Sequence, residues 1–383
     1  MKSVNLCREL FDRAVERTAS PRAKLSVVSN GVLPEGSPAF VEIEENDGPE
    51  IFCSKITYLQ VFHEARVFLQ ERNGNTSLSD ADTYFATLGL LLTTPEDRTN
   101  LNLHEAIILQ RLKEESEHQG KLTKEGHIFL AREIMAVMLL LTSSLNRVNK
   151  SPSLWLLYRK LFTILKELFP AFEVDYQRLF LTSAERHFSN FYCWNTFRWV
   201  YDLESPSTQA QLLTAVWDFS SQHPKDSSAW WALGHSVLNL SALSEYSSKD
   251  YNSLRSRFGF EQSPHHASEV NSVGELTQYS SEIIKFIEIG EVSDWPPFGC
   301  LARLLRYVTE KDQAQFLQKW YNEIQAFEKK YFEINKNSVS LAIYKNDRGL
   351  IFQRSVQSLL HRKTLLKKIG VLVFFSTAEE NPS

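Results

Sequence analysis

Lys150 is the residue of this chain whose position most directly suggests chemistry. It directly precedes Ser151 and Pro152, a pair typical of a helix start, because serine can cap the first turn and proline fits the first helical position. The unpaired N–H groups and the dipole of a helix N-terminus favour an anion, and a lysine ammonium beside them adds to that preference. An anion site at Lys150 is one interpretation. A solvated surface lysine is the other, and the sequence alone favours the second.

Three tryptophans open three similar segments and indicate an internal repeat. Trp155 ends KSPSLW, Trp194 ends SNFYCW and Trp230 ends HPKDSSAW, at intervals of 39 and 36 residues. Such a period, with two helices per unit, is typical of an α-solenoid. Tryptophan at this spacing is expected to pack between paired helices, and an aromatic ligand site is the less favoured interpretation. Arg159 and Arg198 each follow a tryptophan by four residues and are expected to bridge to the next repeat rather than to bind an anion.

The sequence contains no other motif that predicts a metal site or a self-sufficient active site. The four cysteines are far apart and form no CxxC pair, which is typical of reduced intracellular thiols. His265 and His266 have no cysteine or acid at ligand spacing, and the pairs that begin at His63 and His104 lack a second histidine four residues on. No P-loop, GxGxxG or GxSxG motif is present.

Composition and charge exclude several classes of protein. The net charge of −4 argues against a protein that coats nucleic acid by bulk electrostatics. The longest apolar stretch, residues 135–145, is too short to cross a bilayer, and the charged N-terminus lacks the apolar core of a secretory signal. The sequence therefore predicts a cytoplasmic protein with no membrane span and no nucleic-acid partner.

The elements that position these residues are mainly helices. The chain has only 14 glycines and 13 prolines but 12% aromatic residues, a balance that favours packed helices over a turn-rich β fold. Residues 24–52 alone suggest two or three short strands or an extended arm. We expect a division into 1–54 (an N-terminal helix and the arm), 55–244 (helical repeats), 245–272 (a polar loop or insertion), 273–375 (further helices of the same superhelix) and 376–383 (a disordered tail).

The repeat segments resemble those of protein prenyltransferase α subunits. HPKDSSAW at 223–230 and KSPSLW at 150–155 are similar to that family's repeat opening, and residues 90–109 resemble a worn first repeat. NGVLPEGSPAFVEIE resembles the N-terminal arm of one branch, the α subunit of the type III geranylgeranyltransferase. The resemblance covers residues 24–244. It implies an all-α fold, a right-handed α–α superhelix of helical hairpins with a short non-helical N-terminal arm.

The resemblance also implies roles for two site residues. Lys150 matches the family's lysine that reaches the isoprenoid diphosphate, and Tyr192 matches its diphosphate-facing histidine. Three positions depart from the pattern. Pro152 replaces an aromatic residue, and Arg159 and Arg198 lie one step beyond the family's repeat arginines, which puts retained catalysis in doubt.

The implied function is that of the α subunit, without zinc, of a heterodimeric protein geranylgeranyltransferase. A β subunit of the Rab geranylgeranyltransferase type would carry the zinc and the lipid pocket. Geranylgeranyl diphosphate would bind at the subunit interface, and the acceptor would be a protein with C-terminal cysteines, such as an already farnesylated SNARE. No cofactor is expected in this chain. The sequence does not indicate which acceptor or β subunit is used, or what residues 245–383 do.

Two alternatives from another class stay open. One is a tetratricopeptide-like scaffold without an enzymatic partner, since WWALG at 230–234 mimics the W-x-x-L-G of that repeat. Val237 replaces the tyrosine expected three residues after Gly234, which counts against it. The other is a non-catalytic escort for prenylated proteins that keeps the prenyltransferase fold.

Overall fold

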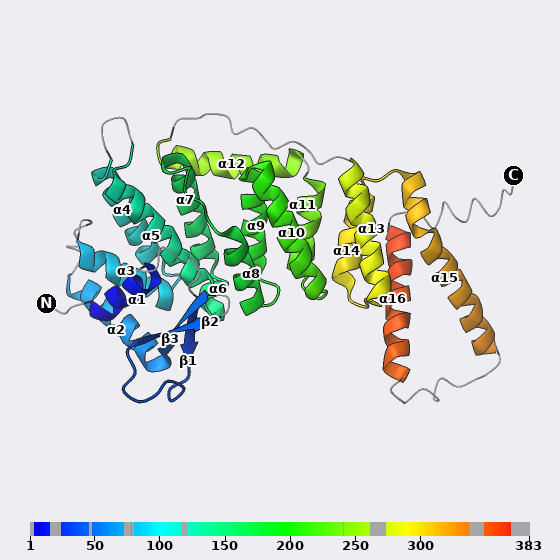
Figure 1. Cartoon of the computed structure of the whole chain (residues 1–383), viewed down its shortest axis with the longest axis horizontal. Helices are drawn as coiled ribbons and strands as arrows, with labels where there is room; N and C mark the ends of the chain where they lie inside the picture. The colour runs from blue at the N-terminus through cyan, green and yellow to red at the C-terminus, as the bar shows by residue number, and fades with distance from the viewer. Residues whose placement is uncertain are drawn as a thin grey trace. The chain divides into compact units, whose positions relative to one another are not determined.

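The computed structural model of the chain is mostly helical, with a small three-stranded sheet near the N-terminus (Figure 1). The structure describes residues 4–15, 24–45, 48–72, 78, 80–116, 121–239, 241–260, 273–336 and 348–368. The chain divides into two compact units. The first comprises Met1–Phe197 with Ser247–His266, and the second comprises Arg198–Tyr246 with Ala267–Ser383. The expectation of an all-helical protein is correct only in the coarser sense of a mostly helical one.

Helices follow one another closely along both units. The first unit contains α1 (Asn5–Val15), α2 (Lys55–Glu71), α3 (Ala81–Thr93), α4 (Arg98–Glu114), α5 (Lys124–Leu141), α6 (Asn146–Asn149), α7 (Pro152–Leu168) and α8 (Tyr176–Arg186). Two helices have residues in both units, α9 (Phe191–Leu203) and α12 (Ser241–Arg257). The second unit contains α10 (Pro206–Gln222), α11 (Ser227–Leu238), α13 (Val273–Ile289), α14 (Trp295–Leu305), α15 (Glu310–Lys336) and α16 (Arg348–Lys368). None of the helices in the described part of the chain is long and apolar enough to span a membrane.

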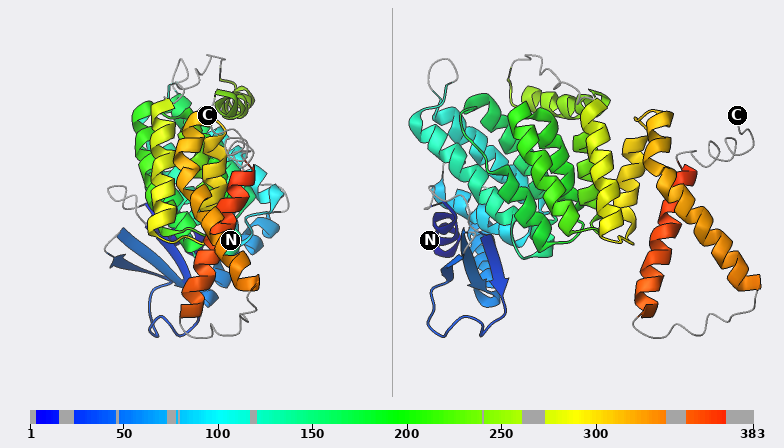
Figure 2. Two further views of the ribbon diagram at one scale, coloured as in Figure 1. Left: turned by 90° about the vertical axis from the view of Figure 1, so that its right-hand side faces the viewer. Right: turned by 45° about the vertical axis from the view of Figure 1, so that its right-hand side comes forward.

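The sheet occupies the region whose sequence does not look helical. β3 (Gly48–Ser54) lies in the centre, parallel to β1 (Lys24–Val28) and antiparallel to β2 (Phe40–Glu45). The sheet lies against α1 and α2 (Figure 2). The backbone of Ser144 also pairs with it, since its N–H donates to the Leu25 carbonyl at 3.0 Å. The sheet is thereby joined to the segment that follows α5.

Many of the helices in the described part of the chain begin at a side chain that accepts a hydrogen bond from the first turn. Serine, threonine or aspartate at these positions satisfies backbone N–H groups that have no partner within the helix. At α7 the Ser151 hydroxyl accepts from the N–H of Leu154, and Pro152 occupies the first helical position. The other side-chain caps of this kind are Ser54, Asp80, Asp97, Thr123, Asp175, Ser205 and Asp226.

The three repeat tryptophans lie in the interior. Trp155 stacks on Phe180 of α8, with ring centroids 6.0 Å apart and an interplanar angle of 10°. Trp194 is also buried. In the second unit, Trp230 lies against Trp217 of α10 and, with centroids 5.5 Å apart, against Phe286 of α13. Trp155 and Trp230 therefore each join neighbouring helices, and all three rings are withdrawn from solvent.

α12 corrects the predicted loop at 245–272. The chain is helical as far as Arg257, whereas residues 261–272, including His265 and His266, lie outside the described residues. The part of this polar helix that belongs to the first unit is held by ion pairs: Arg255 with Glu167 of α7 at 2.8 Å, and Arg257 with Glu105 of α4 at 2.7 Å. Because charge rather than an apolar stripe fixes this helix, its sequence carries little hydrophobic periodicity.

A buried polar chain joins α3, α4 and α5. The Glu133 carboxylate accepts a hydrogen bond from the Tyr84 hydroxyl at 2.5 Å and lies 2.8 Å from His104 Nε2. His104 Nδ1 lies 2.8 Å from the Thr87 hydroxyl, which in turn donates to the Tyr84 carbonyl. The order hydroxyl, imidazole, carboxylate is that of a catalytic triad. All of these side chains are buried, so no substrate can reach Thr87 and the chain is structural.

We predict that Tyr84→Phe destabilises the protein. Burial, the charge of Glu133 and their hydrogen bond raise the pKa of Tyr84 well above its usual value, so its hydroxyl remains a donor. Its loss leaves a buried carboxylate short of one partner, at a cost of about 1.5–3 kcal/mol. Urea unfolding of the full chain measures this.

Tyr58→Phe is the matched control. Its hydroxyl is only partly buried, donates to the neutral Thr93 carbonyl at 3.3 Å and interacts with the exposed Arg147 side chain, so its loss should cost about 0.5–1.5 kcal/mol. If the two substitutions lowered the free energy of unfolding equally, the hydrogen bond from Tyr84 to Glu133 would stabilise the fold no more than the bond from Tyr58 does.

Candidate functional site

The turn between α8 and α9, residues 187–190, carries the most exposed aromatic cluster of the first unit. α8 ends at Arg186, His187 is extended, and Ser189 adopts a left-handed backbone with φ of +51°. This conformation is uncommon for a residue other than glycine and reverses the chain within a few residues. Phe188 projects from the turn into solvent.

Two asparagines form a buried polar junction beneath this turn, here named the Asn149–Asn190 junction. The Asn190 amide donates to the Asn149 side-chain oxygen, and its own oxygen accepts from the Cys193 N–H at 3.3 Å. The Asn149 amide donates to the carbonyls of Leu141 and Ser183, at 2.7 and 3.3 Å. Both asparagine side chains are fully buried. The junction therefore ties together the end of α5, α6, α8 and the start of α9.

The junction also fixes the first repeat tryptophan. The Trp155 indole N–H donates to the backbone carbonyl of Asn149 at 2.7 Å. A buried carbonyl and a buried indole N–H each need a partner, and here they satisfy one another. The position of α7 is thus coupled to that of the turn.

Lys150 lies at the same turn and bonds to its backbone. Its ammonium donates to the Phe188 carbonyl at 2.9 Å. The N-terminus of α7 beside it is occupied by the protein's own carboxylate, because Glu96 accepts hydrogen bonds from the hydroxyls of Ser151 and Ser153. The Glu96 carboxylate therefore lies where the sequence allowed an external anion, and the Lys150 ammonium holds the backbone of the turn.

Three exposed aromatic side chains surround that turn. Phe188 and Phe191 are each 57% exposed and Tyr192 is 38% exposed. The rings of Phe191 and Tyr192 meet edge to face, with centroids 5.5 Å apart. These three residues are here named the aromatic patch. The sequence led us to Tyr192 only as a candidate diphosphate contact. The signal for the patch, three aromatic residues within five positions at a helix start, went unused.

The patch lies in a mildly positive environment. The Lys150 ammonium lies at the turn, where it bonds to the Phe188 carbonyl, whereas Arg186 is neutralised by an ion pair with the buried Glu50 of β3. Burial, reinforced by the charges of Lys150 and Arg186, lowers the pKa of His187 against the opposing effect of its hydrogen bonds to the backbone of Ser143 and Ser144. The last turn of α8 contains one carboxylate, Glu185.

The two repeat arginines, Arg159 and Arg198, make contacts outside the aromatic patch. Arg159 Nε donates to the Thr196 hydroxyl at 3.4 Å, and its guanidinium lies 3.6 Å from the Asp250 carboxylate of α12. Arg159 thus connects α7 with the next repeat helix and with α12. Arg198 is partly buried on α9 and has an interaction partner of its own.

The cysteines are not poised as nucleophiles. All four are buried, and burial raises the pKa of Cys53 and Cys300 to about 12 and that of Cys7 further still. These three thiols stay protonated at neutral pH, and the thiolate is the reactive form. Within the residues that the structure describes, no group of three potential metal ligands comes together.

Comparison with known proteins identifies the family. Three family models match the chain in succession: the ECM9 N-terminal domain over residues 1–142, the ECM9 middle domain over 154–258 and the ECM9 C-terminal domain over 276–372. The protein ECM9 of Saccharomyces cerevisiae is 31% identical over 332 residues, which are 85% of this chain and 85% of that protein. The chain belongs to the ECM9 family.

This assignment corrects the resemblance to prenyltransferase α subunits. The matching models and the relative are all ECM9, and none of their descriptions names a prenyltransferase. The predictions of a geranylgeranyltransferase α subunit, of a β-subunit partner, of a prenylated acceptor and of geranylgeranyl diphosphate are therefore withdrawn. The zinc expected on that β subunit loses its basis as well. The roles given to Lys150 and Tyr192 toward a diphosphate rested on the same resemblance. That this ECM9-family chain itself carries no cofactor stays a prediction.

The bounds of the family matches show which domain contains the aromatic patch, α12 and Lys150. The aromatic patch and α12 both lie within the ECM9 middle-domain match, whereas Lys150 lies between the N-terminal and middle matches. The inclusion of α12 with α7 in one domain agrees with the ion pair between Arg255 and Glu167.

We predict that the four thiols are unreactive in the folded chain. At pH 8 a disulfide reagent such as dithionitrobenzoate should label none of them, and all four should react after unfolding, because burial blocks access to all four and raises the pKa of Cys7, Cys53 and Cys300. A thiol that reacts in the native chain at the rate of free cysteine would contradict their placement in the core.

The same shifts give a pH dependence. The pKa of Cys300 is raised on folding from 9.0 to about 12, so the unfolded chain loses this proton first, and stability falls as pH rises above 9 toward 12. Between pH 8 and 10, the urea midpoint of a Cys300→Ala variant should fall less than that of the unmodified chain.

Proposed function

We propose that this ECM9-family chain is a helical-repeat scaffold that binds a partner protein at the aromatic patch. The partner presents a short segment that combines apolar and acidic side chains. The stacked helical pairs of each unit form an α-solenoid in this proposal, a fold whose usual role is to offer binding surfaces. The protein is taken to act in the cytoplasm, where buried thiols such as these remain reduced.

The observation that carries the proposal is the exposure of Phe188, Phe191 and Tyr192 at one turn. Large aromatic rings gathered on a surface mark binding sites more often than isolated apolar residues do. From the exposed fractions, the three rings present roughly 300 Å² to solvent. At about 25 cal/mol per Å², covering that area yields roughly 7 kcal/mol before the cost of association is subtracted. That gain is of the same order as the cost of association, so in this proposal the patch anchors a segment that makes further contacts.

The conformation of the turn supports this role. The Asn149–Asn190 junction fixes the start of α9, and the Lys150 ammonium holds the Phe188 carbonyl. Binding groups that are already held in place lose little conformational entropy on association. In this proposal the patch is therefore a preformed binding surface, and it does not need the partner to order it.

The charge near the patch selects the partner's chemistry. The Lys150 ammonium gives a positive charge beside the apolar rings, and Glu50 already neutralises Arg186. Acidic side chains in the bound segment gain from this potential, whereas basic ones are disfavoured.

A peptide-display selection on the full chain tests the proposal. Random peptides selected by the unmodified protein should be enriched in aromatic or aliphatic residues flanked by Asp or Glu. The double variant Phe188→Ala, Phe191→Ala should bind the selected peptides about 100-fold more weakly, because it removes two anchors of roughly 1–2 kcal/mol each. Lys150→Glu should reduce the preference for acidic flanks. Titration calorimetry or fluorescence anisotropy measures the affinities.

The control is Tyr246→Ala, which removes a ring that is 71% exposed outside the patch. This variant should bind the selected peptides as tightly as the unmodified chain. A selection that yields no enriched peptides, or peptides that bind the double variant without loss, would overturn the proposal.

A further inference from the structure

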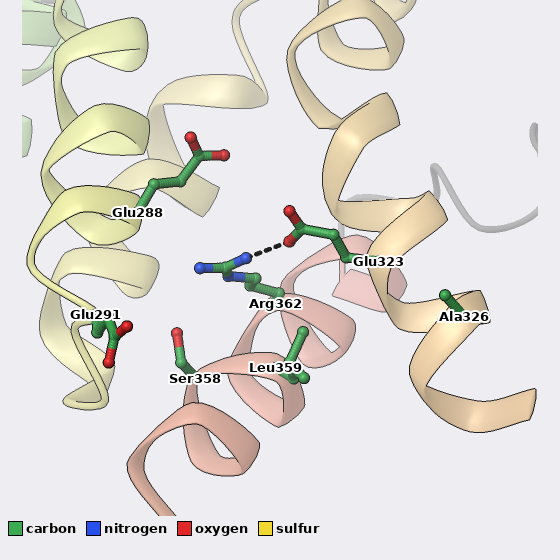
Figure 3. Close-up of a pocket in the computed structure, with 7 residues that line it drawn as sticks. All are labelled: Glu288, Glu291, Glu323, Ala326, Ser358, Leu359 and Arg362. Atoms are coloured by element: carbon green, nitrogen blue, oxygen red, sulfur yellow. Dashed lines mark hydrogen bonds and ion pairs between the residues drawn. The ribbon is translucent and has the colours of Figure 1, made fainter. Parts of the chain in front are cut away.

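The second unit contains a cavity of about 400 Å³ between α13, α15 and α16 (Figure 3). It lies wholly within the segment matched by the ECM9 C-terminal domain. The seven residues that line it are Glu288, Glu291, Glu323, Ala326, Ser358, Leu359 and Arg362. Five of them are polar, and a cavity of this size accommodates a small molecule or one or two peptide residues.

Part of the wall is held in place by internal contacts. The Glu288 carboxylate accepts from Lys319 and from the Trp320 indole N–H, both at 2.8 Å, and these hydrogen bonds outweigh burial to lower its pKa. Arg362 donates to Glu323 at 2.5 Å and lies over the Trp320 ring, 4.9 Å from its centroid. Glu288, Glu323 and Arg362 are therefore fixed and charged before any ligand arrives.

Two donor groups of α16 face the cavity without a protein partner. The Ser358 side chain is 2% exposed, yet its hydroxyl makes no hydrogen bond. Arg362 lies one helical turn further along the same face, and its buried Nε–H is also without a partner. Buried polar groups of this kind cost free energy unless a ligand or water satisfies them. In Figure 3 the Ser358 hydroxyl points into the space between Glu291 and Arg362.

The opposite side of the cavity offers an available carboxylate. Glu291 follows the end of α13 and is exposed, and among the described residues no hydrogen bond or ion pair of its side chain is found. With Glu288 and Glu323 it gives three negative charges, against the two positive charges of Arg362 and Lys319. The C-terminal end of α13 adds partial negative charge. The cavity thus has a surplus of about one negative charge beside two unsatisfied donors.

We propose that this cavity binds an α-ammonium group together with its adjacent carbonyl oxygen. The ammonium pairs with Glu291, and the carbonyl oxygen accepts from the Ser358 hydroxyl and from Arg362. This chemistry is shared by the unblocked N-terminus of a peptide and by a free amino acid. The surplus negative charge favours the peptide N-terminus, whose net charge is positive, over the neutral zwitterion. The site lies in the other unit from the aromatic patch and does not depend on it.

Calorimetric titration of the full chain with three small probes tests this site. Leucinamide keeps both the ammonium and the carbonyl oxygen, free leucine adds a negative charge, and N-acetylleucinamide lacks the ammonium. We expect leucinamide to bind and N-acetylleucinamide to bind at least about tenfold more weakly, the effect of one lost charged hydrogen bond. Weaker binding of leucine than of leucinamide identifies a peptide N-terminus, and equal or tighter binding identifies a free amino acid.

Variants locate the binding in this cavity. Glu291→Gln and Ser358→Ala should each weaken leucinamide binding about tenfold. Glu282→Gln, which changes another carboxylate of α13 outside the cavity, is the matched control and should leave the affinity unchanged. Circular dichroism melting of each variant checks that the fold is intact. The proposal is overturned if neither leucinamide nor leucine binds, if blocking the ammonium has no effect, or if the control variant loses as much affinity as the other two.

Discussion

A hydrogen bond between two buried asparagines holds the first unit together at the place where its surface is most unusual. Asn149 and Asn190 lie far apart in the sequence and join the end of α5, α6, α8 and the first turn of α9. Neither side chain is reached by solvent, so each unmet hydrogen bond would cost on the order of 1–3 kcal/mol. The helices can therefore settle only where all of these bonds form together. The carbonyl of Asn149 extends the constraint to Trp155, and through it to α7.

The consequence of this constraint is visible on the surface. A turn fixed from below presents Phe188, Phe191 and Tyr192 outward instead of burying them, and Lys150 holds its backbone from the side. Elsewhere in the same unit the polar groups with catalytic potential are sealed inside, as in the chain from Tyr84 to Thr87. Buried polarity in this unit serves to position helices, and the proposed binding role rests on the exposed aromatic rings.

Much of the fold follows from the sequence, because long amphipathic helices and capped starts have local signals. The helix start at Ser151 and Pro152 is where the sequence predicts it, and the three strands lie in the region for which the sequence left two or three strands or an extended arm open. α12 was missed, since ion pairs to Glu105 and Glu167 distant in sequence stabilise it. The site was harder to predict from the sequence. Glu96 accepts hydrogen bonds from Ser151 and Ser153 at the helix N-terminus beside Lys150, although it lies 55 and 57 positions away from them in the sequence, and no local pattern reveals this contact. The three repeat tryptophans are buried, yet their spacing led to the wrong family.

Amide hydrogen exchange at the start of α9 tests most directly whether the junction holds the patch in place. The N–H groups of Cys193 and Trp194 bond to the side chain and the carbonyl of Asn190. In the native full chain we predict that they exchange at least ~10³-fold more slowly than in an unfolded peptide, as amides in packed helices do. In an Asn190→Ala variant this protection should fall while α2 and α3 keep theirs. Exchange of the wild-type turn at the rate of an unstructured peptide would contradict a preformed aromatic patch.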